Sequence, residues 1–387
     1  MKTLFKNAKV ILPERIEEGW LLAEDGLILD IGTGACPAAD TVVDCGGSYL
    51  SPGFVELHSH GAAGADFMDG TAEAFEAACL MHLKHGTTTI LPTGLAAATN
   101  DIIRLIDNFR EAQELLKGRG PRIPGLHMEG PYLNRDQCGA IEPEFIRPPV
   151  EREYEAFLSH GKGCIKRWTL AIEQPGALRF VWRLKEEGIL PSIGHSNAEY
   201  SQVLEGFEAG MTHVTHLYSA MSTITRKGGF RHPGVLESAF IIRDMTVELI
   251  ADGCHVPPEL LELVYRVKGP DKTCLVCDSM RCAGLNVKTG TLGKGQQVII
   301  EDGVAKLPDR TAFAGSIALD DRLVRTMVQQ ARVPLADAVK MMTLTPARIA
   351  GLDKEVGSLE KGKRADLVLF DEDINIQAVY VDGVKLV

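Results

Sequence analysis

The sequence predicts an α/β fold: a (β/α)8 TIM-type barrel joined to a small β-sandwich domain that is formed from both chain termini. Two observations carry this prediction. Between residues 54 and 278, eight apolar, β-rich runs alternate with longer helical patterns, as parallel strands joined by crossover helices do. Both ends of the chain instead contain short strand-like runs separated by turns. Eight such strands favour a closed barrel, which can take up about 250 residues as one domain.

The two ends of the chain share one pattern. Strand-like runs cover 4–10, 20–24, 27–31 and 42–45, with a tight turn at 24–26, and short strands return over 357–387 with turns at 371–373 and 382–383. The first of these segments is too small to enclose a core of its own. We therefore expect residues 1–51 and 351–387 to pair into one β domain, and residues 52–350 to form the barrel.

The barrel elements follow from the apolar periodicity. The predicted strands are 54–58, 87–93, 123–129, 168–172, 190–195, 213–217, 247–252 and 274–278. Apolar residues at helical spacing predict helices over 71–85, 100–117, 174–187, 200–209 and 258–267. After the eighth strand, two β-like stretches around Gly303 predict a hairpin inserted near 286–309, and helices follow over 320–330 and 335–344.

Composition excludes several classes of partner. The chain has 52 acidic and 41 basic residues, for a net charge of -11, which argues against binding to nucleic acid or to an anionic membrane. No apolar run reaches the 18 residues of a membrane span, and no signal-like segment follows Met1. The nine scattered cysteines suit a reduced protein, so we expect a cytoplasmic location.

The first barrel strand ends in a histidine pair. His58 and His60 are two residues apart, so on a strand both side chains point the same way. Two adjacent imidazoles can form half of a metal site. Taken alone, His-x-His is a weak signal, and two ordinary polar residues at a strand end are the alternative.

Later strand ends carry further residues of the same kind. A barrel of this type places its working residues at the C-terminal ends of its strands. The residues at these ends are Glu129, His195, His216, Asp252 with His255, and Asp278. If the barrel forms, these side chains converge with the first histidine pair on one rim. Histidines and carboxylates together suit zinc, iron(II) or manganese.

This donor set predicts a type of chemistry. A divalent metal lowers the pKa of a bound water and polarises a carbonyl group. A carboxylate beside it can take the water proton and later give it to a leaving amine, and we expect Asp278 to have that role. The pattern therefore indicates metal-assisted hydrolysis of an amide.

The ordered motifs also resemble a known family. The chain is similar to the amidohydrolase superfamily and, within it, to the N-acetylglucosamine-6-phosphate deacetylase family. The matching segments are SPGFVELHSHG (51–61), GLHMEGPYLN (125–134), IGHS (193–196), THLYSAM (215–221), IADGCH (250–255), LVCDSMRCAG (275–284), FAGS (313–316), TPAR (345–348) and GSLEKGKRADLVLFD (357–371). The resemblance implies an acetate-releasing enzyme for a small amino sugar phosphate. It also implies one or two divalent ions, with zinc as the first candidate, and a homodimer in which the partner chain helps to hold the substrate.

The resemblance also assigns roles to individual residues. Glu129, His195 and His216 match the main metal ligands of the family, and His58 with His60 matches the pair that supports a second metal in some members. Asp278 matches the catalytic acid/base. The positions that match the substrate pocket are Ala140, Ile141, Ser219, Ala220, Arg231, His255, Phe313, Ala314 and Gly315.

Several departures from the family pattern concern the substrate pocket. Ile141 stands where members carry a histidine, and Ser219 stands where they carry an asparagine. The segment from Arg231 to Gly234 follows a longer basic loop, so Arg231, Lys227 and Arg226 can offer charge-assisted donors to a phosphate; a solvated turn without a binding role is the alternative. Three alternatives stay open: another amino sugar, another small N-acyl or cyclic amide, or a non-catalytic binding protein on the same scaffold.

Overall fold

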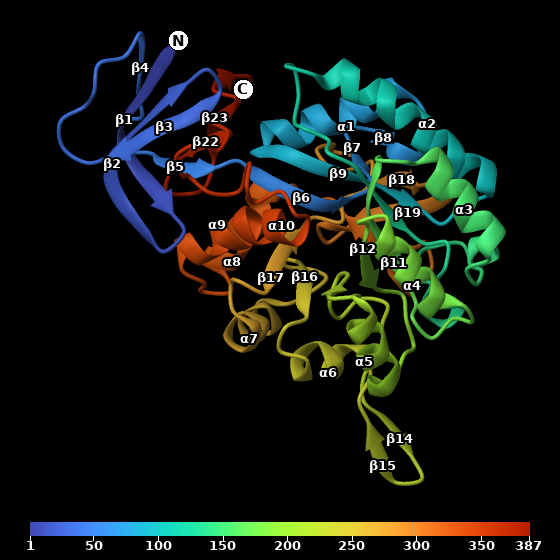
Figure 1. Ribbon diagram of the computed structural model, residues 1–387. Helices are drawn as coiled ribbons and strands as arrows, with labels where there is room; N and C mark the ends of the chain where they lie inside the picture. The colour runs from blue at the N-terminus through green and yellow to red at the C-terminus, as the bar shows by residue number, and fades with distance from the viewer. Residues whose placement is uncertain (294) are drawn as a thin grey trace.

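A closed ring of parallel strands forms the centre of the larger part of the molecule (Figure 1). The computed structural model describes residues 1–293 and 295–387. The ring contains β6 (Phe54–Ser59), β9 (Thr87–Leu95), β10 (Leu126–Glu129), β11 (Ile165–Leu170), β12 (Leu190–Ile193), β13 (His213–Val214), β16 (Thr246–Ile250) and β17 (Thr273–Val276), adjacent in that order. At the seam, the amide of Asp278 donates to the carbonyl of His58 at 2.9 Å, and the amide of His60 donates to that of Ser279 at 2.8 Å. The predicted barrel is confirmed.

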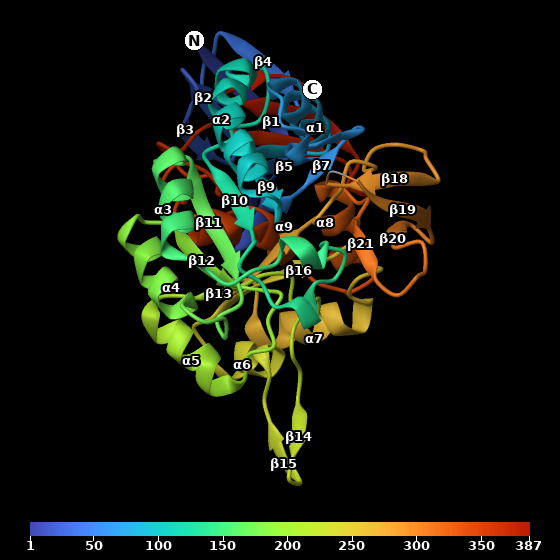
Figure 2. The ribbon, with the colours of Figure 1, turned by 90° about the vertical axis from the view of Figure 1, so that its right-hand side faces the viewer.

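Helices cover the outside of the barrel in both ribbon views (Figures 1 and 2). They are α1 (Ala72–Lys84), α2 (Thr99–Leu116), α3 (Glu151–His160), α4 (Ala177–Glu186), α5 (Tyr200–Ala209), α6 (Val235–Ile241), α7 (Pro258–Lys268), α8 (Asp320–Gln329), α9 (Leu335–Met342) and α10 (Leu344–Ile349). The expected helices are present, and the sequence missed α3, α6 and α10. The seven residues of α6 are too few to show a helical period.

Strand β11 shows how the two faces of the barrel wall differ. Side chains alternate along a strand, so Arg167 and Trp168 point to opposite sides. Trp168 is fully buried, and its ring lies 5.1 Å from Phe180 of α4 and 6.2 Å from Phe157 of α3, measured between ring centroids. Arg167 contacts side chains of the neighbouring strands inside the barrel, including Thr215 at 2.8 Å. The outer face thus packs the helices, and the inner face holds a polar layer.

Both ends of the chain meet in one eight-stranded sheet beside the barrel, as predicted (Figure 1). It consists of β1 (Lys2–Leu12), β2 (Arg15–Glu24), β3 (Leu27–Gly32), β4 (Thr41–Asp44), β5 (Tyr49–Pro52), β22 (Leu367–Phe370), β23 (Ile376–Val381) and β24 (Val384–Lys385). The antiparallel pair β5–β22 joins the two halves, with Leu50 opposite Leu369. Leu50 and Leu367 are buried together with Phe5, Val10 and Leu21.

Two β insertions extend from the barrel. The hairpin expected around Gly303 is present as β19 (Gln296–Glu301) and β20 (Val304–Lys306), and β18 (Thr289–Leu292) and β21 (Phe313–Ser316) enlarge it to four strands. A second hairpin, β14 (Thr225–Lys227) with β15 (Phe230–His232), projects away from the rest of the chain in both views (Figures 1 and 2). A further short pair, β7 (Gly61–Ala62) with β8 (Ala65–Asp66), follows β6. Within the described ranges, no helix is both long and apolar enough to cross a membrane.

Candidate metal centre

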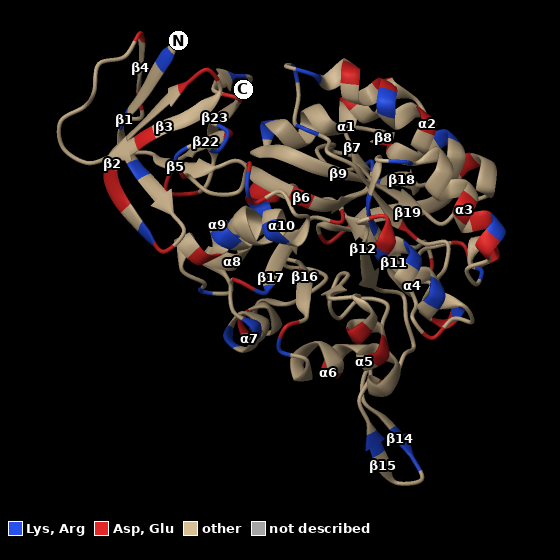
Figure 3. Ribbon diagram, viewed as in Figure 1, with Lys and Arg blue, Asp and Glu red and all other residues tan. Residues whose placement is uncertain are grey.

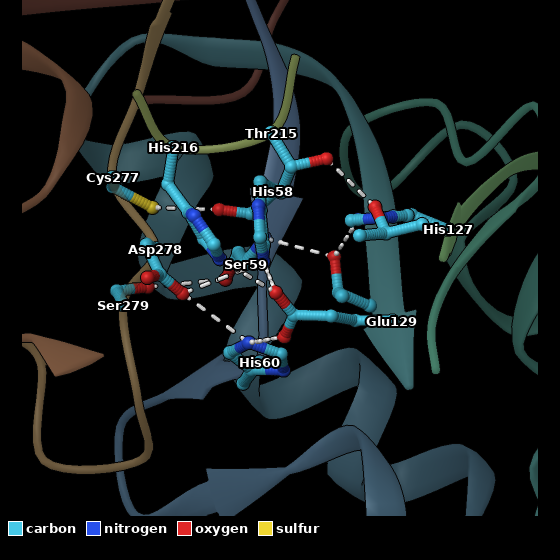
Figure 4. Close-up of polar contacts among 12 residues, drawn as sticks. His58, Ser59, His60, His127, Glu129, Thr215, His216, Cys277, Asp278 and Ser279 are labelled. Carbon is cyan, nitrogen blue, oxygen red and sulfur yellow. Dashed lines mark hydrogen bonds and ion pairs between the residues drawn. The ribbon is translucent and has the colours of Figure 1, made fainter. Parts of the chain in front are cut away.

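Histidines and carboxylates from separate strands meet at the C-terminal rim of the barrel (Figure 4). His58 lies in β6 and Glu129 ends β10. The other members follow their strands by one or two residues: His60 after β6, His195 after β12, His216 after β13 and Asp278 after β17. The barrel therefore brings the predicted ligand set and the predicted acid/base together, although they are up to about 220 residues apart in sequence.

The backbone turns sharply at three of these residues. His195, His216 and Asp278 have φ angles of 48°, 28° and 45°. Residues with a Cβ rarely adopt such left-handed conformations. The conformation costs free energy and is retained where the surrounding structure enforces it, most often at functional sites. The strained backbone distinguishes His195, His216 and Asp278 from the histidines buried within strands, and no sequence pattern predicts it.

Glu129 lies at the centre of the cluster. Its Oε1 atom is 2.9 Å from Nε2 of His216, 3.2 Å from Nε2 of His195 and 3.4 Å from Nε2 of His58. Its Oε2 atom is 3.1 Å from Nε2 of His60. One carboxylate is thus shared between two groups of donors, one formed with His195 and His216 and the other with His58 and His60.

The donor atoms fit a divalent cation. Nε2 of His58 is buried and has no hydrogen-bond partner, which is costly unless something else satisfies it. His195 uses Nδ1 against the carbonyl oxygen of Gln137 at 2.7 Å, so that its Nε2 is free to act as a ligand. Imidazole nitrogens and carboxylate oxygens at this spacing are the donors that zinc, iron(II) and manganese use.

Asp278 lies next to one of the two donor groups. Its Oδ1 atom is 3.2 Å from Nε2 of His60 and 3.5 Å from Nε2 of His58. Burial by itself would raise the pKa of Asp278, but the adjacent imidazoles outweigh burial and hold that pKa below its usual value. Asp278 is therefore ionised at neutral pH and can accept a proton.

The cluster forms the floor of a cavity of about 370 Å³. The cavity is lined by the metal-ligand candidates His60, Glu129, His195 and His216, by Asp278, and by the predicted pocket residues Ala140, Ile141, Ser219, Ala220, His255, Phe313, Ala314 and Gly315. The sequence did not single out Leu95, Asp136, Gln137, Gly139, Tyr218, Leu292 and Ala312, which complete the wall. His58 is fully buried and does not line the cavity.

One side of the cavity mouth is formed by an aromatic pair. The ring of His255 lies 4.9 Å from that of Phe313, in an edge-to-face arrangement. Nδ1 of His255 bonds to Oδ2 of Asp252 at 2.8 Å. Asp252 accepts the hydrogen bond from Nδ1 of His255, so the other ring nitrogen, Nε2, is left for the cavity. Phe313 is 39% exposed and begins β21, which places the β18–β21 sheet directly at the mouth.

Arg231 is the one predicted pocket residue that lies elsewhere. It is on β15, in the projecting hairpin, and does not line the cavity of its own chain. The sequence places it 15 residues after His216, close enough for a loop to fold back over the site. The antiparallel pairing of β14 with β15 instead holds this segment extended.

The remaining histidine of this region has hydroxyl partners. Nε2 of His127 lies 2.7 Å from Thr169 Oγ1 and Nδ1 lies 3.2 Å from Thr93 Oγ1. Its ring packs edge-on against His58 with centroids 4.6 Å apart (Figure 4). His127 therefore supports the ring of a ligand candidate by packing and contributes no ligand atom of its own.

The chain is similar to known proteins along nearly its whole length. Residues 49–386 match the amidohydrolase family. The chain is 32% identical to the N-acetylglucosamine-6-phosphate deacetylase of Bacillus subtilis (strain 168), over 96% of this chain and 94% of that protein. It is 31% identical to the N-acetylgalactosamine-6-phosphate deacetylase of Escherichia coli O157:H7, over 95% and 96%. Its fold is similar to the structure of a mutant of the Mycobacterium smegmatis N-acetyl-D-glucosamine-6-phosphate deacetylase in complex with N-acetyl-D-glucosamine-6-phosphate, with a TM-score of 0.91, 31% identity and coverage of 100% and 99%.

Proposed function

This chain belongs to the amidohydrolase family, and from that premise we propose that it hydrolyses the acetamide of N-acetylglucosamine 6-phosphate to glucosamine 6-phosphate and acetate. The observation that carries the proposal is Glu129, which is shared between two groups of histidines beside an ionised Asp278 at the floor of a cavity. Relatives that cover nearly the whole chain at about 30% identity are deacetylases of N-acetylated amino sugar phosphates.

The side chains of the site have two roles, metal binding and proton transfer. His195 and His216 would hold one divalent ion, His58 and His60 a second, and Glu129 would contact both. When bound, such an ion polarises a carbonyl and lowers the pKa of a water. Asp278 takes the proton of the attacking water as the C–O bond forms, and then delivers it to the amino-sugar nitrogen as the C–N bond breaks. We infer zinc as the first ion to test, followed by iron(II) and manganese.

The wall of the cavity bears on which sugar is accepted. Ile141 is 6% exposed and gives an apolar surface where the family pattern has a histidine. Ser219 offers a shorter polar group than asparagine. These two positions can favour a different hydroxyl configuration, and one of the similar proteins acts on N-acetylgalactosamine 6-phosphate. We infer an amino sugar phosphate as the substrate class and the glucosamine form as its first member.

Acetate release from three N-acetylated sugars, together with ring opening of a cyclic amide, tests this proposal. We expect metal-loaded protein to prefer N-acetylglucosamine 6-phosphate over unphosphorylated N-acetylglucosamine by about 100-fold in kcat/KM, because charge-assisted hydrogen bonds to a phosphate contribute about 1.5 to 3 kcal/mol each. N-acetylgalactosamine 6-phosphate and a cyclic amide complete the panel. A higher rate with the galactosamine form would reassign the sugar. Activity on the cyclic amide alone would refute deacetylation.

The projecting hairpin supports a dimer. Phe230 is 77% exposed and Ile224 is 56% exposed, which is unfavourable for apolar side chains in water. The basic residues of this hairpin are visible in Figure 3. Among the described residues, the side chain of Arg231 has no carboxylate partner and donates one hydrogen bond, to the carbonyl oxygen of Gly229 at 3.4 Å. We infer that the hairpin docks on a second copy of the chain and that Arg231 reaches the phosphate in the partner's cavity.

Mixed dimers test whether Arg231 acts across the subunit boundary. Arg231→Ala and Asp278→Asn homodimers should each lose activity. When the two variants are unfolded, mixed and refolded together, half of the dimers are heterodimers, and each of these has one site with both residues intact. Activity should therefore recover to about a quarter of the wild-type value. No recovery, with dimers present by light scattering, would mean that Arg231 acts within its own chain, and an active Arg231→Ala homodimer would mean that it has no role.

We also infer that the protein is located in the cytoplasm, which is a reducing compartment. All nine cysteines are free thiols in the structure, which suits a compartment that keeps cysteine reduced.

A further inference from the structure

Glu248 is a buried carboxylate that lies beneath the metal centre and contacts both groups of donors. It comes from β16 and is fully buried. Its Oε2 atom lies 3.3 Å from Nδ1 of His58, and the same oxygen accepts the backbone N–H of His216 at 3.0 Å. One carboxylate oxygen thus touches a ligand candidate from each of the two groups.

The other oxygen of Glu248 is neutralised from inside the barrel. Oε1 forms an ion pair with the guanidinium of Arg167, which is also buried. Arg167 is held in turn by Ser192 Oγ, which accepts from Nε at 3.0 Å, and by Thr215 Oγ1, which accepts from Nη2 at 2.8 Å. Without Arg167 a carboxylate at this depth would be very costly. The pair fixes the position of Glu248 from below.

The carboxylate of Glu248 could bind a metal ion itself or could position the histidines of the metal centre, and Arg167 favours the second role. His213, Glu248 and Cys274 are close enough to one another to suggest a metal site of their own. The guanidinium of Arg167 already provides the positive charge that a cation would bring there. Glu248 is therefore available to act on the histidines above it.

The chemistry of the contact sets the tautomer of His58. An ionised carboxylate only accepts hydrogen bonds, so the imidazole must carry its hydrogen on Nδ1 where it faces Glu248. When the ring is neutral, as a metal ligand must be, Nε2 then keeps its lone pair. That atom is the one that is buried without a hydrogen-bond partner and faces Glu129 at 3.4 Å and Asp278 at 3.5 Å.

We propose that Glu248 is a positioning residue that fixes His58 as a metal ligand and ties it to the backbone of His216, so that the second metal subsite depends on this carboxylate. The proposal rests on the proposed metal-dependent function. It explains why a charged pair occupies the interior of a type of barrel that is usually filled with apolar side chains. Partners of this kind typically change metal affinity by 10- to 100-fold.

Glu248→Gln is the informative substitution. Arg167 only donates hydrogen bonds, so the amide oxygen of Gln must face Arg167 and the NH2 group must face His58. An NH2 donor there favours the opposite tautomer, with hydrogen on Nε2, and so blocks the lone pair that would bind the metal. The substitution changes one atom and leaves the volume of the side chain nearly the same.

Manganese binding to the full-length, metal-stripped chain provides the test. With Mn²⁺ alone as the probe, we expect the wild type to bind two ions and to give the electron paramagnetic resonance spectrum of a coupled pair. Glu248→Gln should bind the second ion 10- to 100-fold more weakly and give an uncoupled spectrum, as His58→Asn should. Ser192→Ala is the matched control, because it removes one hydrogen bond of Arg167 but leaves both contacts of Glu248, and it should keep the coupled pair.

Two results would overturn the proposal: a coupled pair in Glu248→Gln with affinity within about twofold of the wild type, or a wild type that binds a single ion. Thermal unfolding of each variant separates misfolding from a specific loss. If Glu248→Gln does not fold, Glu248→Asp keeps the charge against Arg167 but withdraws the carboxylate from His58 and from the backbone of His216, and it should weaken the second ion more than the first. Acetate release by the wild type tests the proposed function separately.

Discussion

Replacing Asp278 by Asn is expected to lower kcat by about 10²- to 10⁴-fold, because general acid–base catalysis by a positioned side chain contributes about that much to the step that limits the rate. Asn has nearly the same shape but cannot accept the water proton. The carboxylate it replaces lies 3.2 Å from His60 and is held ionised by the imidazoles around it. Steady-state acetate release by the variant measures the effect.

Metal content distinguishes loss of proton transfer from loss of the site. Asp278→Asn should retain the metal stoichiometry of the wild type, since four histidines and Glu129 remain. Asp244→Asn removes the same charge from an exposed carboxylate that pairs with Lys272 and serves as the matched control, with activity near that of the wild type. Near-full turnover by Asp278→Asn would remove this residue from the mechanism.

Replacing Glu129 by Gln is expected to remove bound metal and activity together. Both oxygens of Glu129 face imidazoles, at 2.9 Å for Oε1 to His216 and 3.1 Å for Oε2 to His60. An amide supplies one neutral oxygen in place of two anionic ones, so each group of donors loses charge. A metal contributes several kcal/mol of transition-state stabilisation, and we therefore expect kcat/KM to fall by at least about 10³-fold.

Elemental analysis of the purified variant, beside its kinetics, checks this result. Glu151→Gln provides the comparison, because Glu151 is an exposed carboxylate on α3 that pairs with Arg179. That variant should keep both metal and activity. Two equivalents of metal retained in Glu129→Gln would contradict the assignment of Glu129 as the shared ligand. Loss of metal with activity intact would contradict the metal-dependent chemistry itself.

The sequence predicted the barrel because its strands are buried on both faces. Runs such as Thr87–Leu95 of β9 are apolar or hydroxylic throughout, and every residue of β9 is buried. Helix α2 likewise shows its buried residues Ile102, Leu105, Ile106 and Phe109 at helical spacing. The β14–β15 hairpin gave no such signal. Its six paired residues are mostly exposed, so no burial pattern marks them as strands.

The sequence predicted only those candidate site residues that lie at the ends of barrel strands. Barrel geometry makes any His or carboxylate at such an end a candidate, and Glu129, His216 and Asp278 were found in that way. Glu248 sits in mid-strand, where position alone suggests packing. Its contact with Arg167 of β11 depends on the register of strands that are far apart in sequence. The left-handed backbone at His195 is likewise set by the surrounding loops and leaves no trace in the residue pattern.

The β5–β22 pairing has a consequence for how the chain is made. Leu50 emerges from the ribosome more than 300 residues before Leu369, its partner across the sheet. Until then β5 has an unpaired edge on that side, and an unpaired strand edge can form hydrogen bonds with strands of other molecules and so cause aggregation. Because so many residues must be synthesised first, completion of this sheet is a late event in biogenesis. The last strands therefore close the sheet of the nascent protein, and interrupted translation would leave an incomplete sheet with an exposed, aggregation-prone edge beside the barrel.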